Sequence, residues 1–169
     1  MEKINFNSVK LIAYDFDGVM TDNTVFINQN GQEMVQVNRG DGLAIEKIKN
    51  IGIEQIIIST EKNPIVSARA KKLNIICFQG IKNKKNTLTN YCSENKIKMK
   101  NVIFLGNDIN DQEVMEIVGI SCCPLDANAS IGISPLISPL NFKITGSIVL
   151  LCSSNNFKAW DSSLPIIAL

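Results

Sequence analysis

Short apolar runs, three of them ended abruptly by polar residues, most constrain the fold of this chain. Runs of this length that are rich in Ile, Val or Leu are typical of strands buried on both faces of a parallel sheet. They occupy residues 9–14, 55–58, 74–78 and 102–105. Segments with helical spacing of apolar residues alternate with them, at residues 41–50, 64–72, 84–95 and about 111–118. This alternation predicts an α/β fold: a parallel sheet with helices on both faces.

A projecting β-hairpin is predicted between the first strand and the first helix. Residues 24–37 contain two partly alternating segments around Asn30-Gly31, a dipeptide typical of hairpin turns. In the helix that follows, Asp41 is placed as the N-cap and Gly52 as the stop signal.

Length and composition indicate one globular domain. The 169 residues are 45% hydrophobic, which is enough to bury one continuous core. We expect this domain to span residues 1–169, with its core at about 9–126 and a poorly defined tail at 127–169. In that tail, residues 148–152 are a candidate last strand or helix and two Ser-Pro pairs are expected breaks.

Charge and rare residues exclude several classes of function. The 17 basic and 16 acidic residues give a net charge of +1, so neither nucleic acid nor a membrane is expected as a partner. The five cysteines lack CxxC spacing and are interpreted as reduced thiols, mostly in the core. With no histidine, acid–base chemistry falls to carboxylates, lysines or metal-bound water. No signal peptide or apolar run of membrane-spanning length is present, so we expect a cytoplasmic protein.

Polar side chains follow three of the predicted strands at their carboxyl ends, where parallel sheets bind ligands. They are Asp15 and Asp17, then Ser59 and Thr60, then Asn107 and Asp108. Two aspartates this close repel each other unless a cation lies between them, and oxygen ligands of this kind suit Mg²⁺. The sequence therefore predicts a magnesium site with Asp15, Asp17, and Asn107 or Asp108 as ligands.

These groups fit the hydrolysis of a phosphate ester. One carboxylate would attack phosphorus to give an aspartyl-phosphate, and a second carboxylate two residues further on would act as general acid and then as general base. A hydroxyl and a lysine ammonium are suited to hold the phosphoryl oxygens, over which the charge of the transition state spreads.

The same residues resemble the four motifs of the haloacid dehalogenase (HAD) phosphatase superfamily, which has a Rossmann-like fold. Residues 15–19 with Asp22 look like its first motif, Ser59 like its second, Lys84 like its third and residues 106–111 like its fourth. The hairpin and the absence of an inserted cap domain resemble its capless branch, which acts on octulosonate 8-phosphates and nonulosonate 9-phosphates. Further segments shared with that branch are residues 38–45, 69–73 and 78–80.

This resemblance implies a Mg²⁺-dependent phosphatase for a 2-keto-3-deoxy sugar acid, assembled as a homotetramer whose hairpins pack together. Asp15 would be the nucleophile and a metal ligand, and Asp17 the general acid and base with its carbonyl on the metal. Ser59, Thr60 and Lys84 would bind phosphate. Many relatives have aspartate where this chain has Asn107, so Asn107, Asp108 and Asp111 remain alternatives for the last ligand.

Four further residues are candidate substrate contacts: Arg39, Asp41, Glu61 and Lys72. Glu61 occupies a position where octulosonate phosphatases commonly carry arginine. An acid there would repel a sugar carboxylate and accept hydrogen bonds from hydroxyls or an amine, which favours a nonulosonate 9-phosphate.

Each assignment has an alternative. Asp22 is interpreted as structural, holding its turn by hydrogen bonds, and Arg39 and Asp41 equally fit loop and cap roles. Ser59 and Asp111 fit helix caps as well as functional roles. Lys82 or Lys85 is an alternative to Lys84.

The function also has alternatives. The tail lacks the GGxGxxRE-like segment of typical members, and Asn107 brings no charge. The second interpretation is therefore a non-catalytic phosphatase-like module that drives oligomerisation or regulates sugar-nucleotide synthesis of the acylneuraminate cytidylyltransferase type. A phosphotransferase that uses the same intermediate is a third.

Overall fold

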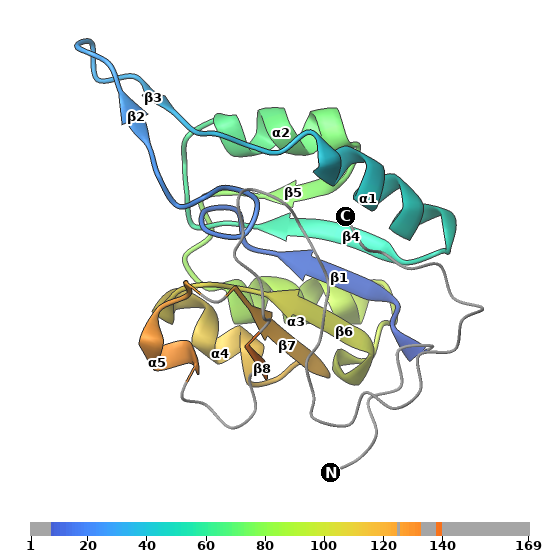
Figure 1. Ribbon diagram of the computed structural model, residues 1–169. Helices are drawn as coiled ribbons and strands as arrows, with labels where there is room; N and C mark the ends of the chain where they lie inside the picture. Colours follow the sequence, from blue (N-terminus) through green and yellow to red (C-terminus); the bar gives the residue numbers. More distant parts are fainter. Residues whose placement is uncertain (1–7, 125, 133–137, 140–169) are drawn as a thin grey trace.

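A parallel sheet forms the centre of the molecule in the computed structural model, which describes residues 8–124, 126–132 and 138–139. Within these residues the sheet has six strands in the order β5-β4-β1-β6-β7-β8 (Figure 1). They are β1 (Leu11–Tyr14), β4 (Glu54–Ile58), β5 (Ile76–Phe78), β6 (Val102–Leu105), β7 (Ile120–Cys123) and β8 (Ser138–Pro139). The predicted α/β fold and its first four strands are confirmed.

Helices cover both faces of this sheet (Figure 1). One face packs against α1 (Gly40–Asn50) and α2 (Ile65–Leu73). The other face packs against α3 (Lys84–Glu94), α4 (Gln112–Met115) and α5 (Ala129–Gly132). Two 3₁₀ turns, η2 (Met99–Asn101) and η3 (Ile109–Asp111), precede β6 and α4.

The central strand β1 supplies both halves of the core. Because side chains alternate along a strand, Ile12 and Tyr14 pack with α1 and α2, while Leu11 and Ala13 pack with α3 and α4. All four side chains are buried. The four described cysteines fit the prediction of core residues: Cys92, Cys122 and Cys123 are buried and Cys77 is half-buried, whereas Cys152 lies outside the described residues.

The predicted hairpin is confirmed. Strands β2 (Phe26–Ile27) and β3 (Glu33–Met34) pair in antiparallel fashion and project beyond the sheet (Figure 1). The Asn28 side chain accepts hydrogen bonds from the N–H groups of Asn30 and Gln32 at 2.9 and 3.0 Å, which closes the turn. A bridge between Thr21 and Val37 closes the base of the hairpin.

Strand β7 was missed by the sequence analysis. It carries Ser121, Cys122 and Cys123, which give no β-branched signal, and its burial comes from pairing with β6 and from the clusters on both faces. The short elements α5 and β8 were missed as well, and one Ser-Pro pair expected as a break forms β8. An edge strand tolerates a proline because one side of it needs no N–H donor. The candidate element at residues 148–152 lies outside the described residues.

Two local predictions were wrong. Asp41 does not cap α1, because the helix already begins at Gly40 and Asp41 lies buried in its first turn. The helix predicted to end near Val118 is shorter, since α4 ends at Met115. The Ser121 hydroxyl donates a hydrogen bond to the Met115 carbonyl and so replaces the next helical N–H.

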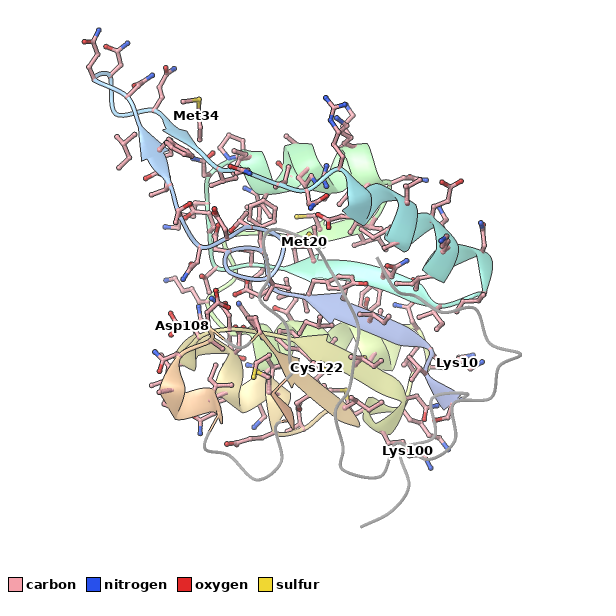
Figure 2. All side chains as sticks on the ribbon, in the orientation of Figure 1. Lys10, Met20, Met34, Lys100, Asp108 and Cys122 are labelled. Atoms are coloured by element: carbon pink, nitrogen blue, oxygen red, sulfur yellow. The ribbon has the colours of Figure 1, made fainter. Side chains whose placement is uncertain are left out.

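The two edges of the sheet differ in the side chains that they present. Figure 2 shows Asp108 near the edge where the strands end, and Lys10 and Lys100 at the opposite edge. Among the described helices, none is long and apolar enough to cross a membrane.

Candidate active site

Three neighbouring strands bring the predicted polar groups to one edge of the sheet. Asp15 directly follows β1, Ser59 follows β4 and Asn107 follows the end of β6 by two residues. β1 lies between β4 and β6, and the Asp15 N–H donates to the Leu105 carbonyl at 2.8 Å. Asp15, Ser59 and Asn107 are all buried. Because their three strands are neighbours in the middle of the sheet, the site forms at the centre of the sheet edge.

Lys84 forms a buried double ion pair with two carboxylates. Its Nζ lies 2.8 Å from Asp15 Oδ1 and 2.6 Å from Asp111 Oδ1. Lys84 begins α3, whose N-cap Asn83 accepts a hydrogen bond from the Asn86 N–H at 2.7 Å. Of the alternatives left open, the exposed Lys82 does not enter this cluster, which supports Lys84 as the match to the third motif.

Asp111 holds both Lys84 and the loop after β6. Its Oδ2 accepts hydrogen bonds from the N–H groups of Asn107 and Asp108 at 3.0 and 3.3 Å, and it forms a reciprocal capping box with Asp108 at η3. Because both oxygens are engaged, the cap interpretation of Asp111 is favoured over direct metal contact. The pairing with Lys84 was not predicted, since it joins residues 27 positions apart.

Burial changes the acidity of the candidate nucleophile. Removal from water raises the pKa of Asp15 to about 7, and the neighbouring Asp111 carboxylate also raises it. Lys84 and the Phe16 N–H, which donates to Asp15 Oδ1 at 2.7 Å, lower it. Additional positive charge at this point would favour the ionised, nucleophilic form.

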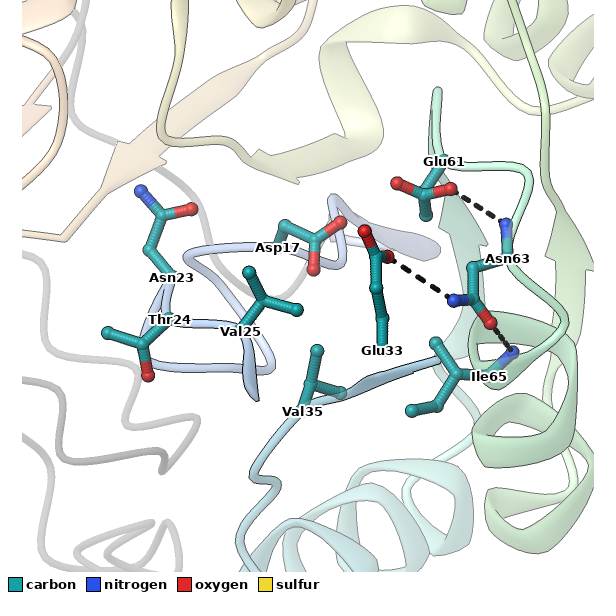
Figure 3. Close-up of a pocket in the computed structure, with 9 residues that line it drawn as sticks. All are labelled: Asp17, Asn23, Thr24, Val25, Glu33, Val35, Glu61, Asn63 and Ile65. Carbon is teal, nitrogen blue, oxygen red and sulfur yellow. Dashed lines mark hydrogen bonds between the residues drawn. The ribbon is translucent and has the colours of Figure 1, made fainter. Parts of the chain in front are cut away.

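Asp17 lies beside a cleft of about 200 Å³. Figure 3 shows this cleft between the loop after β1, the hairpin and the loop that leads into α2. Partial burial raises the pKa of Asp17, and the nearby Glu61 and Glu33 carboxylates raise it further, against the influence of Lys84. A carboxyl group with a raised pKa keeps its proton to a higher pH, as a general acid requires.

The residues present fit a hard cation. The Oδ1 atom of Asn107 is buried and has no hydrogen-bond partner among the described residues, which is costly unless a ligand satisfies it. Amide, carboxylate and backbone oxygens are the ligands that Mg²⁺ takes. Among the described residues, no group of three or more His, Cys, Asp or Glu side chains is arranged to hold a metal. The fit therefore depends on Asn107 together with the Asp15 carboxylate and the Asp17 carbonyl.

The exposed Asp108 is engaged elsewhere. Its Oδ1 accepts hydrogen bonds from the Ile109 N–H at 2.7 Å and from Asn128 Nδ2 at 3.0 Å. This supports a capping role, and its metal contact stays a prediction.

The hydroxyls after β4 belong to a turn. Ser59 Oγ accepts a hydrogen bond from the Glu61 N–H at 3.1 Å, and Thr60 Oγ1 accepts one from Asn110 Nδ2 at 3.4 Å. Ser59 is not the cap of the following helix, because the N-cap of α2 is Pro64. The phosphate contacts of Ser59 and Thr60 stay predictions.

Two of the four candidate substrate residues are not brought to the site. Asp41 is fully buried and pairs with Arg69 at 3.2 Å, so its predicted substrate contact is wrong. Lys72 lies in the last turn of α2. Because this helix begins at the strand-end edge and rises about 1.5 Å per residue away from it, Lys72 lies toward the opposite edge of this chain, and its substrate contact stays a prediction.

The other two lie near the strand-end edge. Glu61 lines the cleft, and its Oε1 accepts hydrogen bonds from the Lys62 and Asn63 N–H groups at 2.6 and 2.7 Å. Arg39 is exposed at the start of α1, and its substrate contact stays a prediction.

The structural interpretation of Asp22 is confirmed. Its Oδ1 accepts hydrogen bonds from the Thr24 N–H at 3.1 Å and the Thr24 hydroxyl at 2.6 Å. These bonds lower the pKa of Asp22 and hold the turn that leads into the hairpin. The sequence analysis missed Glu33, which also lines the cleft. The only available signal was that the hairpin directly follows the first motif.

Comparison with known proteins agrees with this geometry. The family model of haloacid dehalogenase-like hydrolases matches residues 5–132. The chain is 33% identical over 122 residues to the 3-deoxy-D-manno-octulosonate 8-phosphate phosphatase KdsC of Salmonella typhi, covering 72% of this chain and 65% of that protein. It therefore spans slightly less than two thirds of the length of that relative.

Two further similarities concern a larger protein and a solved structure. N-acylneuraminate cytidylyltransferase A of Danio rerio is 31% identical over 123 residues, covering 70% of this chain and 28% of that protein. The crystal structure of the 3-deoxy-D-manno-octulosonate 8-phosphate phosphatase of Moraxella catarrhalis contains a magnesium ion, a phosphate ion and a KDO molecule. It superimposes with a TM-score of 0.69 at 27% identity, covering 73% of this chain and 71% of that chain. From the four ordered motifs, the parallel sheet and the family match over most of its length, this chain belongs to the haloacid dehalogenase-like hydrolase family.

Proposed function

We propose that this protein is a Mg²⁺-dependent phosphatase that hydrolyses the phosphate monoester of a 2-keto-3-deoxy sugar acid through an aspartyl-phosphate on Asp15. One observation carries the proposal: the buried Asp15 lies at a strand end against Lys84, and Asp111, the other partner of Lys84, holds the loop of Asn107, whose amide oxygen has no hydrogen-bond partner among the described residues. The candidate nucleophile, the ammonium proposed to bind phosphate and the amide proposed to bind metal therefore share one edge of the sheet, which supports the proposal.

Lys84 and the hydroxyls after β4 would bind the phosphoryl group. Because Lys84 Nζ lies 2.8 Å from Asp15 Oδ1, its positive charge is already positioned where an anionic phosphoryl group must approach the nucleophile. Asp111 keeps the ammonium in place from the other side at 2.6 Å. Ser59 and Thr60 would donate hydrogen bonds to the remaining phosphoryl oxygens.

The first chemical step would transfer the phosphoryl group to the enzyme. An oxygen of Asp15 forms a bond to phosphorus, the bond from phosphorus to the ester oxygen breaks, and the leaving alkoxide takes a proton from Asp17. In the second step Asp17 takes a proton from water as that water attacks phosphorus. The bond between Asp15 and phosphorus then breaks, which releases inorganic phosphate and restores Asp15.

A metal ion would be held by the Asp15 carboxylate, the Asp17 backbone carbonyl and Asn107. When bound, Mg²⁺ supplies positive charge that favours ionised Asp15 and offsets its repulsion of the phosphoryl group. The magnesium and phosphate ions in the Moraxella catarrhalis phosphatase support this assignment.

Octulosonate 8-phosphate and nonulosonate 9-phosphate are the proposed substrates. The name of the Salmonella typhi relative supports the first, and Glu61 in the cleft supports the second, because an acid there suits hydroxyl or amine groups. Both substrates carry the phosphate at the end of the carbon chain remote from the carboxylate.

A homotetramer built on the hairpins is proposed as the assembly. The hairpin exposes large apolar side chains, which are unfavourable in water unless a partner covers them. They are Val25, Phe26, Ile27 and Met34.

Phosphate release from both sugar-acid phosphates, measured with Mg²⁺, tests the function. We expect turnover by the native protein and a loss of at least about 1,000-fold in Asp15→Asn, because the amide is not a nucleophile. Asp22→Asn is the matched control, since it removes the same charge from a residue that only holds a turn. Equal rates in the native protein and Asp15→Asn would contradict the proposal.

The second candidate function is a non-catalytic module that regulates sugar-nucleotide synthesis. The similarity to a cytidylyltransferase of Danio rerio and the uncharged Asn107 favour it. It predicts a stable oligomer without turnover, so trapping of a phosphorylated Asp15, detected by mass spectrometry of the borohydride-reduced protein, would eliminate it.

A further inference from the structure

The hairpin contributes a carboxylate to the cleft beside Asp17. Glu33 of β3 reaches over the cleft toward Asp17 and Glu61, as Figure 3 shows. Its Oε2 accepts a hydrogen bond from Asn63 Nδ2 at 3.4 Å, and Asn63 Oδ1 in turn accepts one from the Ile65 N–H at 3.2 Å. Asn63 thus connects the hairpin to the start of α2 and places Glu33 on the wall of the cleft.

The lining of the cleft has a clear chemical preference. It contains three carboxylates, those of Asp17, Glu33 and Glu61, and neither lysine nor arginine occurs among its described lining residues. A negatively charged group of a substrate would be repelled there, whereas hydroxyl groups can donate charge-assisted hydrogen bonds to the carboxylates. Val25, Val35 and Ile65 add apolar surface suited to the C–H groups of a carbon chain.

The position of the cleft defines which part of a substrate would enter it. Asp17 belongs both to this cleft and to the loop that carries Asp15. If Asp17 protonates the leaving oxygen, the atoms next to that oxygen extend into the cleft. Its volume of about 200 Å³ accommodates a short segment of carbon chain, since one water occupies roughly 30 Å³ in the liquid.

We infer that Glu33 contacts the substrate and, together with Glu61, accepts hydrogen bonds from the hydroxyls of the leaving alcohol that flank the ester. The cleft thereby selects a polyhydroxylated chain over one that carries a carboxylate at the same place. This inference rests on the proposed function, because it requires Asp17 to act on the leaving group. For a sugar acid phosphorylated at its far end, it orients the carboxylate away from the cleft.

Three esters of equal chain length test the role of Glu33: erythritol 4-phosphate, n-butyl phosphate and erythronate 4-phosphate. For the native protein we expect the highest kcat/KM with the polyol ester. Glu33→Ala should lower kcat/KM for that ester by about 10-fold or more, since a hydrogen bond to a charged group is lost, and should change n-butyl phosphate by less than about 2-fold. Glu33→Gln should raise kcat/KM for erythronate 4-phosphate relative to the polyol ester.

Glu46→Ala is the matched control. It removes the same charge from an exposed position on α1 that does not line the cleft, so all three rates should remain unchanged. Both glutamates are exposed, and their substitution is not expected to impair folding. An equal loss with all three esters in Glu33→Ala, or unchanged turnover of the polyol ester, would overturn the inference.

The two proposals fail in different ways. If the native protein with Mg²⁺ releases phosphate neither from the two sugar-acid phosphates nor from any of the three esters, the proposed function fails. Calorimetric titration of the native protein and of Glu33→Ala with the same esters then tests whether Glu33 contacts the ester. Tighter binding of the polyol ester than of n-butyl phosphate, lost in Glu33→Ala, supports the contact. Binding that does not depend on Glu33 overturns it.

Discussion

The strand-end cluster of Asp15, Lys84 and Asp111 and the hairpin both depart from the usual distribution of side chains, but in opposite ways. At the strand ends, charged groups are buried: Asp15 is 5% exposed and Lys84 is 3% exposed. On the hairpin, apolar groups face water: Phe26 is 58% exposed and Ile27 is 63% exposed. Most proteins bury apolar residues and expose charges. Both departures cost folding free energy, and both coincide with the places where we propose chemistry and assembly.

Breaking the buried cluster should produce the largest effect. Asp111→Ala leaves the Lys84 ammonium with one partner fewer and frees the N–H groups of Asn107 and Asp108. We expect the free energy of unfolding to fall by about 3–5 kcal/mol, as for other buried pairs that lose one member. Urea denaturation followed by circular dichroism measures this.

A neighbouring capping residue provides the control for that measurement. Asp108→Ala removes an exposed helix cap and should cost only about 1 kcal/mol. Similar losses in the two variants would show that the buried ion pairs contribute no more than an ordinary cap.

Substitutions at two glycines with the same backbone conformation, one next to Asn107 and one in the hairpin, compare the two regions directly. Gly18 and Gly31 have φ of +73° and +74°, but a Cβ on Gly18 would lie 2.0 Å from Asn107 Nδ2, whereas one on Gly31 would meet nothing within 4 Å. Gly31→Ala should cost about 1 kcal/mol from backbone strain alone. Gly18→Ala should cost about 2–3 kcal/mol, because Asn107 must also move.

Mg²⁺ titrations and urea denaturation of both glycine variants test this difference. Only Gly18→Ala should weaken Mg²⁺ binding, since only that substitution displaces Asn107. Equal effects of the two substitutions on stability and on metal affinity would contradict the close contact between Gly18 and Asn107.

Stability should depend on pH through Asp15. Its pKa is raised in the folded state from 3.8 to about 7, so between these values the folded protein keeps a proton that the unfolded chain has lost. Stability of the metal-free protein therefore falls as pH rises through this interval. Asparagine does not ionise, so Asp15→Asn should be more stable than the native protein by about 1–3 kcal/mol at pH 8.

At pH 4 the difference between Asp15→Asn and the native protein should be small. Urea denaturation in EDTA at several pH values between the two pKa values of Asp15 measures how stability changes over this interval. Parallel stability curves for the two proteins would show that the pKa of Asp15 is not raised on folding.

The smallest effect on the stability of the single chain is expected from the hairpin. Replacing Phe26 and Ile27 by serine should change the free energy of unfolding by no more than about 0.5 kcal/mol per site, because both side chains are exposed. The same double variant should dissociate the proposed tetramer, measured by sedimentation velocity. Gln29→Ser, on the same exposed hairpin, is the control. An unchanged sedimentation coefficient in the double variant would contradict assembly through the hairpin.

Much of the fold could be predicted because its signals are local. The strands that begin at Leu11 and Val102 are continuous apolar runs, the strand that begins at Glu54 ends in three isoleucines, and the Asn30-Gly31 turn needs only its own residues. Strand β7 has no such signal, since Ser121 and two cysteines become a strand only through pairing with β6. A sequence read residue by residue contains no measure of that pairing.

The candidate site shows the same division. Asp15, Asp17, Ser59 and Asn107 were found because each lies at the end of a strand or in the loop that follows it, a position that the sequence reveals. Asp41 was misplaced because its partner comes from another segment. Asp41 is buried by Arg69 of α2, and Lys72 lies along a helix that leads away from the site.

The sequence by itself determined the order of the first four sheet strands and the helices that alternate with them, the cluster of aspartates at the end of β1 and the family to which the chain belongs. Only the tertiary structure decided that Lys84 lies between Asp15 and Asp111, and that Glu33 of the hairpin lines the cleft beside Asp17. The physical reason is that strand and helix signals depend on neighbouring residues, whereas ion pairs and clefts join residues that are far apart in the chain. Their positions follow from how the sheet and hairpin pack.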